Sequence, residues 1–113
     1  YLLVEITGGA NMDLLKTMVS DVLQHPKWHP EIPALVDFRG FSARGLSSDD
    51  VYELSDLCKT LGEHLGTGGC ALVMSEELDF GLARMWQMMT EGHVEMTIEV
   101  FKDIDEAKVW VVN

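Results

Sequence analysis

Two arginines near the middle of the chain are the side chains best suited to hold an anion. The sequence contains only three arginines, and Arg39 and Arg44 flank one short loop. A predicted helix follows this loop, and a helix N-terminus offers free N–H groups and positive partial charge. Together with Ser47 and Ser48, the arginines would form a site for phosphate or carboxylate. The alternative, which we favour in so acidic a chain, is that both arginines pair with nearby aspartates such as Asp37.

A second group of side chains is suited to apolar contacts. Met85, Trp86, Met88 and Met89 follow one another closely in a predicted helix. Methionine is flexible and polarizable, so it adapts to irregular partners and ligands. Such a cluster at helical spacing is usually core, but Trp86, Met88 and Met89 cover more than one face of the helix. We therefore predict that part of the cluster contacts a protein partner, a second copy of the chain, or an apolar, lipid-like ligand.

The histidines do not form a convincing metal site. His25 and His29 lie four residues apart with Glu31 close by, but Pro26 and Pro30 disrupt the helix that would align them. No cysteine lies nearby to complete a ligand set. We predict no metal.

Neither glycine-rich segment carries a nucleotide motif. Residues 66–69 (Gly-Thr-Gly-Gly) precede a predicted strand, whereas a phosphate-binding loop follows a strand and begins a helix. Gly8 and Gly9 have that placement but lack the further glycines and the lysine. No nucleophile–base arrangement is recognisable from the sequence either. The sequence therefore indicates no cofactor and no catalytic residue, and an enzyme is the least favoured of the function classes.

The hydrophobic pattern predicts strands that alternate with helices. We expect strands at residues 1–6, 34–38, 70–74 and 96–101, and helices at residues 12–24, 48–65, 75–91 and 104–112, the third irregular near Gly81. Residues 39–46 are expected to be a loop. Ser47 is expected to cap the second helix, in a capping box with Asp50. Strands separated by helices pair in parallel. The predicted fold is one α/β domain over residues 1–113, with a mostly parallel central sheet of four or five strands and four helices, the fifth strand preceding Tyr1.

Composition narrows the function classes. The 113 residues are 47% hydrophobic and 24% charged, as in a globular protein. The 8 basic and 19 acidic residues give a net charge of −11, which repels phosphate backbones and anionic lipids, so we expect no nucleic-acid binding. No apolar run approaches the ~20 residues of a membrane helix, so we expect no membrane insertion. Cys58 and Cys70 sit among apolar neighbours and are predicted to be free thiols, which favours a reducing, cytoplasmic location.

The order of elements and the end of the chain resemble the SpoIIAA-like or STAS-like domains, seen in small bacterial proteins. The resemblance rests on the βαβαβαβα order, on the strand cores 35–37 (Leu-Val-Asp) and 71–73 (Ala-Leu-Val), and on residues 101–110. This last segment is similar to the Phe-x-Asp-x-x-Glu-Ala-x-x-Trp ending of those proteins, with Phe101, Asp103, Glu106, Ala107 and Trp110. The resemblance implies a SpoIIAA-like fold and an interaction or regulatory role rather than catalysis.

The same resemblance implies a candidate phosphorylation site at the start of the second helix. In STAS-like antagonists of anti-sigma factors, a serine there is phosphorylated and switches binding to a partner kinase. That serine follows an Asp-Ser pair, which this chain lacks; Ser47 and Ser48 are instead followed directly by Asp49 and Asp50. A phosphate on Ser48 would meet like charge, so we predict helix capping rather than a switch.

Three functional hypotheses follow from the sequence. The first is a non-enzymatic STAS-like module that docks a protein partner or self-associates. The second is a small-molecule binder, which holds an anion at Arg39 and Arg44 or an apolar ligand near Trp86. The third, an enzyme, is the least favoured.

Overall fold

The computed structural model describes residues 1–9 and 11–113, which form four strands, four α-helices and one short 3-10 helix. The strands are β1 (Leu2–Gly8), β2 (Ala34–Phe41), β3 (Cys70–Val73) and β4 (Ile98–Phe101); the helices are α1 (Met12–Gln24), α2 (Ser48–Leu61), η1 (Gly62–Leu65), α3 (Glu77–Thr90) and α4 (Ile104–Val112). The predicted α/β fold class is confirmed.

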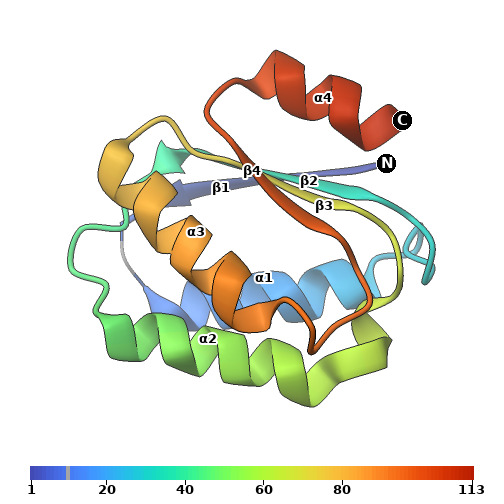
Figure 1. The fold of residues 1–113 in the computed structure, drawn as a ribbon, viewed down its shortest axis with the longest axis horizontal. Helices are drawn as coiled ribbons and strands as arrows, with labels where there is room; N and C mark the ends of the chain where they lie inside the picture. The colour runs from blue at the N-terminus through green and yellow to red at the C-terminus, as the bar shows by residue number, and fades with distance from the viewer. Residues whose placement is uncertain (10) are drawn as a thin grey trace.

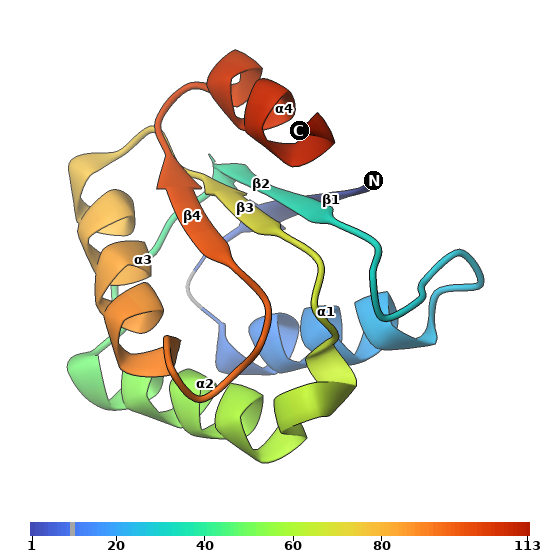
Figure 2. The same ribbon diagram turned by 45° about the vertical axis from the view of Figure 1, so that its right-hand side comes forward.

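The four strands form one parallel sheet in the order β1-β2-β3-β4. The helices α1, α2 and α3 lie on one face of the sheet and α4 lies alone on the other (Figures 1 and 2). Each strand is linked to the next by a helix, which is the connection that parallel pairing requires. This arrangement leaves β1 and β4 as the edge strands.

Each face of the sheet has its own hydrophobic core. One row of paired residues, Val4, Val36, Leu72 and Val100, faces the three helices and belongs to the larger core. The alternate residues of the central strands, among them Leu35, Ala71 and Val73, are fully buried beneath α4 together with Ala107 and Val111. Strands buried on both faces read as continuous apolar runs, as β2 and β3 do.

Side-chain caps start three of the helices where the sequence indicates. Asn11 accepts hydrogen bonds from the backbone N–H groups of the first turn of α1, and Asp103 accepts one at the start of α4. Ser47 caps α2, and its hydroxyl and the Asp50 carboxylate form the predicted capping box. Each cap satisfies N–H groups that have no partner within the helix and contributes about 1 kcal/mol.

Strand β2 is longer than predicted. Arg39, Gly40 and Phe41 were expected in a loop but extend the strand, because its pairing with β1 continues after a shift in register. Thr7 pairs with Gly40, and Gly8 pairs with Phe41. The first strand likewise runs to Gly8 rather than ending at residue 6. Phe41 is buried in the larger core, which explains why an apolar side chain follows two exposed residues.

The other differences from the predicted elements are smaller. The expected irregularity of α3 at Gly81 is wrong: the helix is continuous there, because this glycine lies on its exposed side and costs only about 1 kcal/mol relative to alanine. The single helix predicted over residues 48–65 is instead two helices, α2 and η1, which divide at Gly62. The φ of 49° at this residue suits glycine. Strand β4 begins at Ile98, two residues later than expected.

No helix of the described residues is both long and apolar enough to cross a membrane.

Candidate functional site

The main feature of the interior is an apolar cavity between the sheet and the three helices on its larger face. Its volume is about 160 Å³. The helices α3 and α4 pack closely on the strands, whereas α1 and α2 make few close backbone approaches to the sheet. The space left between them is only partly filled by side chains. The walls come from all three helices and from β2 and β3, with Leu15, Val36, Val51, Cys58, Leu72, Ala83 and Trp86 among the lining residues.

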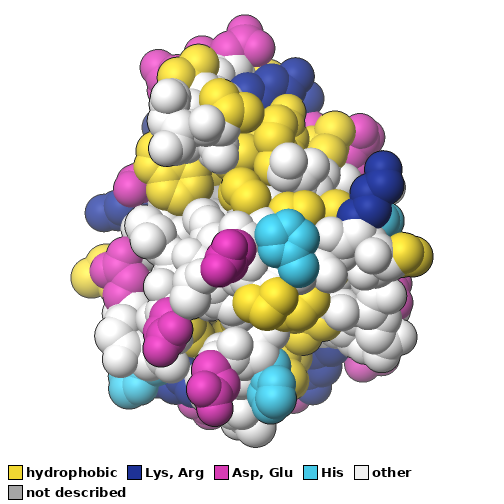
Figure 3. Space-filling model, turned by 90° about the vertical axis from the view of Figure 1, so that its right-hand side faces the viewer, with side chains coloured by type: hydrophobic (Ala, Val, Ile, Leu, Met, Phe, Trp, Pro, Cys, Tyr) yellow, Lys and Arg dark blue, Asp and Glu magenta, His cyan; other side chains and the backbone are white. Residues whose placement is uncertain are grey.

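The cavity extends toward the surface at one end of the molecule. The lining residues at this end are half-buried and come from four separate segments: Leu23 in α1, Trp28 and Ile32 in the proline-rich connection, Leu65 in η1, and Met96 before β4. Figure 3 looks onto this side of the molecule, where hydrophobic side chains show at the surface between histidines and acidic residues. A small molecule therefore has an apolar route inward from this end.

The glycine-rich segment before β3 holds this end of the cavity together. The Thr67 backbone N–H donates to the Pro30 carbonyl oxygen at 2.6 Å. A Cβ atom on Gly66 would lie 2.2 Å from the Pro30 carbonyl oxygen, and one on Gly68 would lie 2.3 Å from the Ile32 carbonyl oxygen. Glycine is needed here because two backbone segments meet directly. The segment therefore packs directly against the proline-rich connection.

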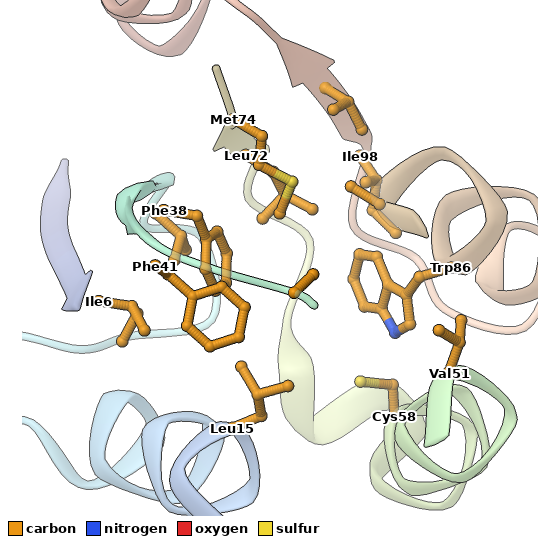
Figure 4. Packing of buried hydrophobic residues seen from close by; sticks show 14 residues of the cluster. Ile6, Leu15, Phe38, Phe41, Val51, Cys58, Leu72, Met74, Trp86 and Ile98 are labelled. Carbon is orange, nitrogen blue, oxygen red and sulfur yellow. The ribbon is translucent and has the colours of Figure 1, made fainter. Parts of the chain in front are cut away.

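Trp86 provides a buried hydrogen-bond donor without a partner. The residue is 9% exposed and lies in the core, and its indole Nε1 has no hydrogen-bond partner among the described residues. Figure 4 shows the nitrogen directed toward the Cys58 thiol, which is a weak acceptor at best. Leaving such a donor unpaired costs about 1–3 kcal/mol, so it marks a place where an acceptor would be favourable.

The two cysteines are free thiols on the wall of the same cavity. Burial raises the pKa of Cys58 to about 11, against a smaller lowering by the neighbouring Trp86 N–H, which would stabilise a thiolate. Burial of its thiol, with a contribution from Cys58, raises the pKa of Cys70 to about 12. Both groups are therefore neutral at physiological pH and poor nucleophiles.

We expect both thiols to resist alkylation in the folded protein. With a pKa near 11, about one Cys58 in a thousand is ionised at pH 8, so iodoacetamide should react at least about a hundredfold more slowly than with an unfolded chain. The comparison is the same protein in urea, with mass spectrometry as the readout. A reaction of Cys58 at the unfolded rate would contradict this account of the cavity wall.

The raised thiol pKa values also predict a loss of stability at high pH. The folded state keeps the proton that the unfolded thiol, with a pKa near 9.0, releases. The contribution of the buried, protonated thiols to the free energy of unfolding is therefore complete below pH 9 and is lost as pH rises from about 9 through 11 and 12. Urea unfolding at pH 8 and pH 10 measures this loss, and we expect a lower free energy of unfolding at pH 10. A higher value at pH 10 would contradict the raised thiol pKa values.

A buried carboxylate joins the cavity wall to the loop after β2. Asp79, in the first turn of α3, is 4% exposed and lines the cavity. Its Oδ1 accepts a hydrogen bond from the Ala43 backbone N–H at 3.0 Å. The positive end of the helix also favours its charge. The sequence pattern gives no sign of this role, because an acid in the first turn of a helix is usually solvated and contributes only to helix stability.

Polar links also fix α3 against its neighbours. The hydroxyls of Ser55 in α2 and Thr90 in α3, both fully buried, lie 3.1 Å apart. The Gln87 side chain donates to the Ile98 backbone oxygen of β4 at 2.7 Å and accepts from Arg84. These hydrogen bonds hold the helix that carries Trp86 against α2 and β4.

The arginines of the predicted anion site are not equivalent in the structure. Arg39 is in β2 and donates from its side chain to both carboxylate oxygens of Asp37, at 2.9 Å each, as the favoured alternative for this arginine held. These hydrogen bonds lower the pKa of Asp37. For Arg44 the expected pairing with an aspartate is wrong: this side chain is exposed and has no ion pair among the described residues. Ser47 is occupied as the cap of α2, and Ser48 is an exposed residue of its first turn.

The methionine and tryptophan cluster divides between core and surface. Trp86 is buried, and Met85 and Met89 are half-buried and pack against the larger core. Met88 is 70% exposed. Within this group, Trp86 is the residue that lines the cavity. Met88 is the member of the group whose side chain is mostly exposed and available to a partner.

The two histidines of the proline-rich connection take part in local turns. The Nδ1 atoms of His25 and His29 each accept a backbone N–H from two residues further along. Within the described part of the chain, no group of three or more His, Cys, Asp or Glu side chains is placed to hold a metal ion.

Comparisons of the chain with protein-family models, with curated proteins and with solved structures gave no match.

Proposed function

We propose that this protein binds a small apolar molecule in the cavity between the sheet and the helices α1–α3. The observation that carries the proposal is the cavity itself, about 160 Å³ and lined almost entirely by hydrophobic side chains. Protein interiors rarely keep voids of this size, because each lost contact weakens packing. A ligand that restores those contacts gains dispersion and hydrophobic free energy at once.

The volume limits the size of the ligand. An apolar cavity of about 150 Å³ in another protein stays dry and binds benzene, so about 160 Å³ suits a molecule of roughly six to ten non-hydrogen atoms. Flexible methionines on the wall, Met18, Met74 and Met96, would allow the cavity to adjust to ligands of different shape. A long fatty acid would not be accommodated without substantial movement of the helices.

The chemistry of the walls favours binding over catalysis. The thiols of Cys58 and Cys70 are the nucleophilic groups on the wall, and their raised pKa values make them unreactive near neutral pH. The Asp79 carboxylate is held by the Ala43 N–H rather than placed beside a nucleophile or base. We therefore propose a carrier or sensor of a small molecule.

Cumene (isopropylbenzene) is a suitable probe of the proposal. We expect one cumene per chain, with a Kd of about 0.1–1 mM for an apolar ligand of this size. Binding to the folded state should add about 0.4 kcal/mol of stability when free cumene equals Kd, and about 1.4 kcal/mol at ten times Kd. Calorimetric titration and the melting temperature measure these effects. The absence of both heat and stabilisation, for cumene and for its ketone analogue acetophenone, would refute the proposal.

A second candidate is the STAS-like module that pairs with a second copy of itself. It is favoured by exposed apolar side chains near the termini, where Leu3 of edge strand β1 is 51% exposed and Val109 and Val112 of α4 are 61% and 68% exposed. The two termini lie near each other in both ribbon views, and hydrophobic side chains gather on that side of the surface (Figures 1, 2 and 3). Sedimentation should then show a dimer that Leu3→Glu dissociates; a monomer at high micromolar concentration would count against it.

A further inference from the structure

We infer that the ligand of the cavity is an uncharged molecule that carries a single hydrogen-bond acceptor, such as a ketone, ester or ether oxygen, which takes the Trp86 indole N–H. The inference rests on the proposed function and specifies its ligand class. It is carried by the unpartnered donor and by the distribution of charge around the cavity.

The donor belongs to the cavity wall and is already held in place. Trp86 lines the cavity, its N–H has no partner among the described residues, and the ring is enclosed by the larger core. The hydrogen bonds of Gln87, the next residue, fix this turn of α3 against β4. A donor that is fixed before the ligand arrives loses little conformational entropy on binding. An oxygen on the ligand would therefore accept from this N–H more strongly than the Cys58 thiol that the N–H faces, which is a weak acceptor.

The surroundings of the cavity disfavour an anionic ligand. None of the described lining residues is lysine, arginine or histidine, and the one charged side chain among them is Asp79. The chain as a whole carries a net charge of −11. A buried carboxylate needs a cation or several donors to offset its loss of hydration, and one indole N–H is insufficient. Small carboxylic acids are thus expected to be rejected.

A cationic ligand is disfavoured for a different reason. Among the described lining residues Asp79 is the one possible counter-ion, and its Oδ1 already accepts the Ala43 N–H at the positive end of α3. An amine would have to give up its hydration for a carboxylate that is already stabilised. It would also leave the Trp86 N–H unpaired, because an ammonium group has no acceptor.

Four probes of equal size separate these possibilities. Cumene has no acceptor, acetophenone has a ketone, benzoate is an anion, and 1-phenylethylamine is a cation at neutral pH; all four contain the same number of non-hydrogen atoms. Calorimetric titration of each into the intact protein is the experiment. We expect acetophenone to bind about tenfold more tightly than cumene, as one hydrogen bond to a buried donor implies. Benzoate and 1-phenylethylamine should bind more weakly than cumene.

Two variants assign the preference to one indole group. Trp86→Phe removes the donor and keeps an aromatic ring, so acetophenone and cumene should bind with affinities within about twofold of each other. Trp110→Phe removes the same group from a half-buried tryptophan on the opposite face of the sheet, away from the cavity, and should leave the tenfold preference intact. Circular dichroism and the melting temperature check that both variants fold.

The outcomes separate the inference from the proposed function. If cumene and acetophenone bind the wild-type protein equally, or if benzoate or the amine binds as tightly as the ketone, the inference is wrong while the cavity remains a binding site. If none of the probes binds, the proposed function and the inference both fail. The preference for acetophenone, its loss in Trp86→Phe and its retention in Trp110→Phe are the expected results.

Discussion

Replacing Ala83 with leucine should abolish most of the binding of small apolar molecules without unfolding the protein. Ala83 is 5% exposed and lines the cavity from α3, one turn before Trp86. Leucine adds three carbon atoms, which would take the place of about three ligand atoms. At roughly 0.3–1.5 kcal/mol per ligand atom, the loss is about 1–4 kcal/mol, or about fivefold or more in Kd.

The effect of Ala83→Leu on stability should be modest, because the new side chain enters existing space. A cost of about 1–3 kcal/mol would apply only if the core were already fully packed. Met88→Leu is the matched control on the same helix: Met88 is 70% exposed, so its variant should bind cumene as the wild type does. Cumene binding to Ala83→Leu within twofold of the wild-type affinity would show that the cavity is not the site.

Replacing Gly66 with alanine should cause the largest loss of stability of the changes considered. The residue has a φ of +81°, and its new Cβ would lie 2.2 Å from the Pro30 carbonyl oxygen. The left-handed backbone costs about 1–2 kcal/mol for a residue with a side chain, and the overlap with the backbone adds about 1–3 kcal/mol. We expect a total near 3 kcal/mol, which corresponds to a fall in melting temperature of roughly 10–20 °C.

Two further glycine variants test the cause of this effect. Gly68→Ala has no left-handed backbone to strain but meets the Ile32 carbonyl oxygen at 2.3 Å, so it isolates the steric part. Gly81→Ala, in the exposed part of α3 with nothing within 4 Å, should stabilise the protein by about 0.5–1 kcal/mol. Denaturant unfolding measures all three. Equal stability of Gly66→Ala and wild type would show that the two segments do not meet as described.

Gly66 and Gly68 allow two backbone segments that line the cavity to contact each other. The segments they join carry Trp28 and Ile32 on one side and Leu65 and Cys70 on the other, all of which line the cavity. The close approach of the backbones therefore sets the width of the mouth. Gly68→Ala should weaken probe binding as well as the fold, unlike a substitution that only destabilises a distant part of the sheet.

Local signals in the sequence predicted the helices well. The caps of α1, α2 and α4 depend on a side chain and the N–H groups two or three residues away, so the sequence alone specifies them. The end of β2 was missed because it depends on pairing with β1, thirty residues earlier, and on a shift in register that no local pattern encodes. The sheet and its parallel pairing followed from the alternation of elements.

The candidate site was only partly predictable. The sequence suggested an apolar ligand near Trp86 but gave no sign that the indole N–H would lack a partner. Asp79 was overlooked, since its contact with the Ala43 N–H spans 36 residues. A cavity is a difference between the volume that helices enclose and the volume that side chains fill, and both quantities depend on tertiary packing. Of the two arginines that were expected to pair with nearby aspartates, Arg39 pairs with Asp37, whereas Arg44 has no ion pair among the described residues.

The most direct test of the central claim is a titration with cumene followed by NMR of the tryptophan indole N–H resonances. The chain has three tryptophans, and the Trp86→Phe spectrum identifies the resonance of Trp86. Trp110, which packs on the opposite face of the sheet beside Phe101, is an internal control. The account predicts a saturable shift of the Trp86 resonance with little change at Trp110. An unchanged Trp86 resonance at concentrations that saturate binding, or a saturable shift confined to Trp110, would contradict binding in the cavity.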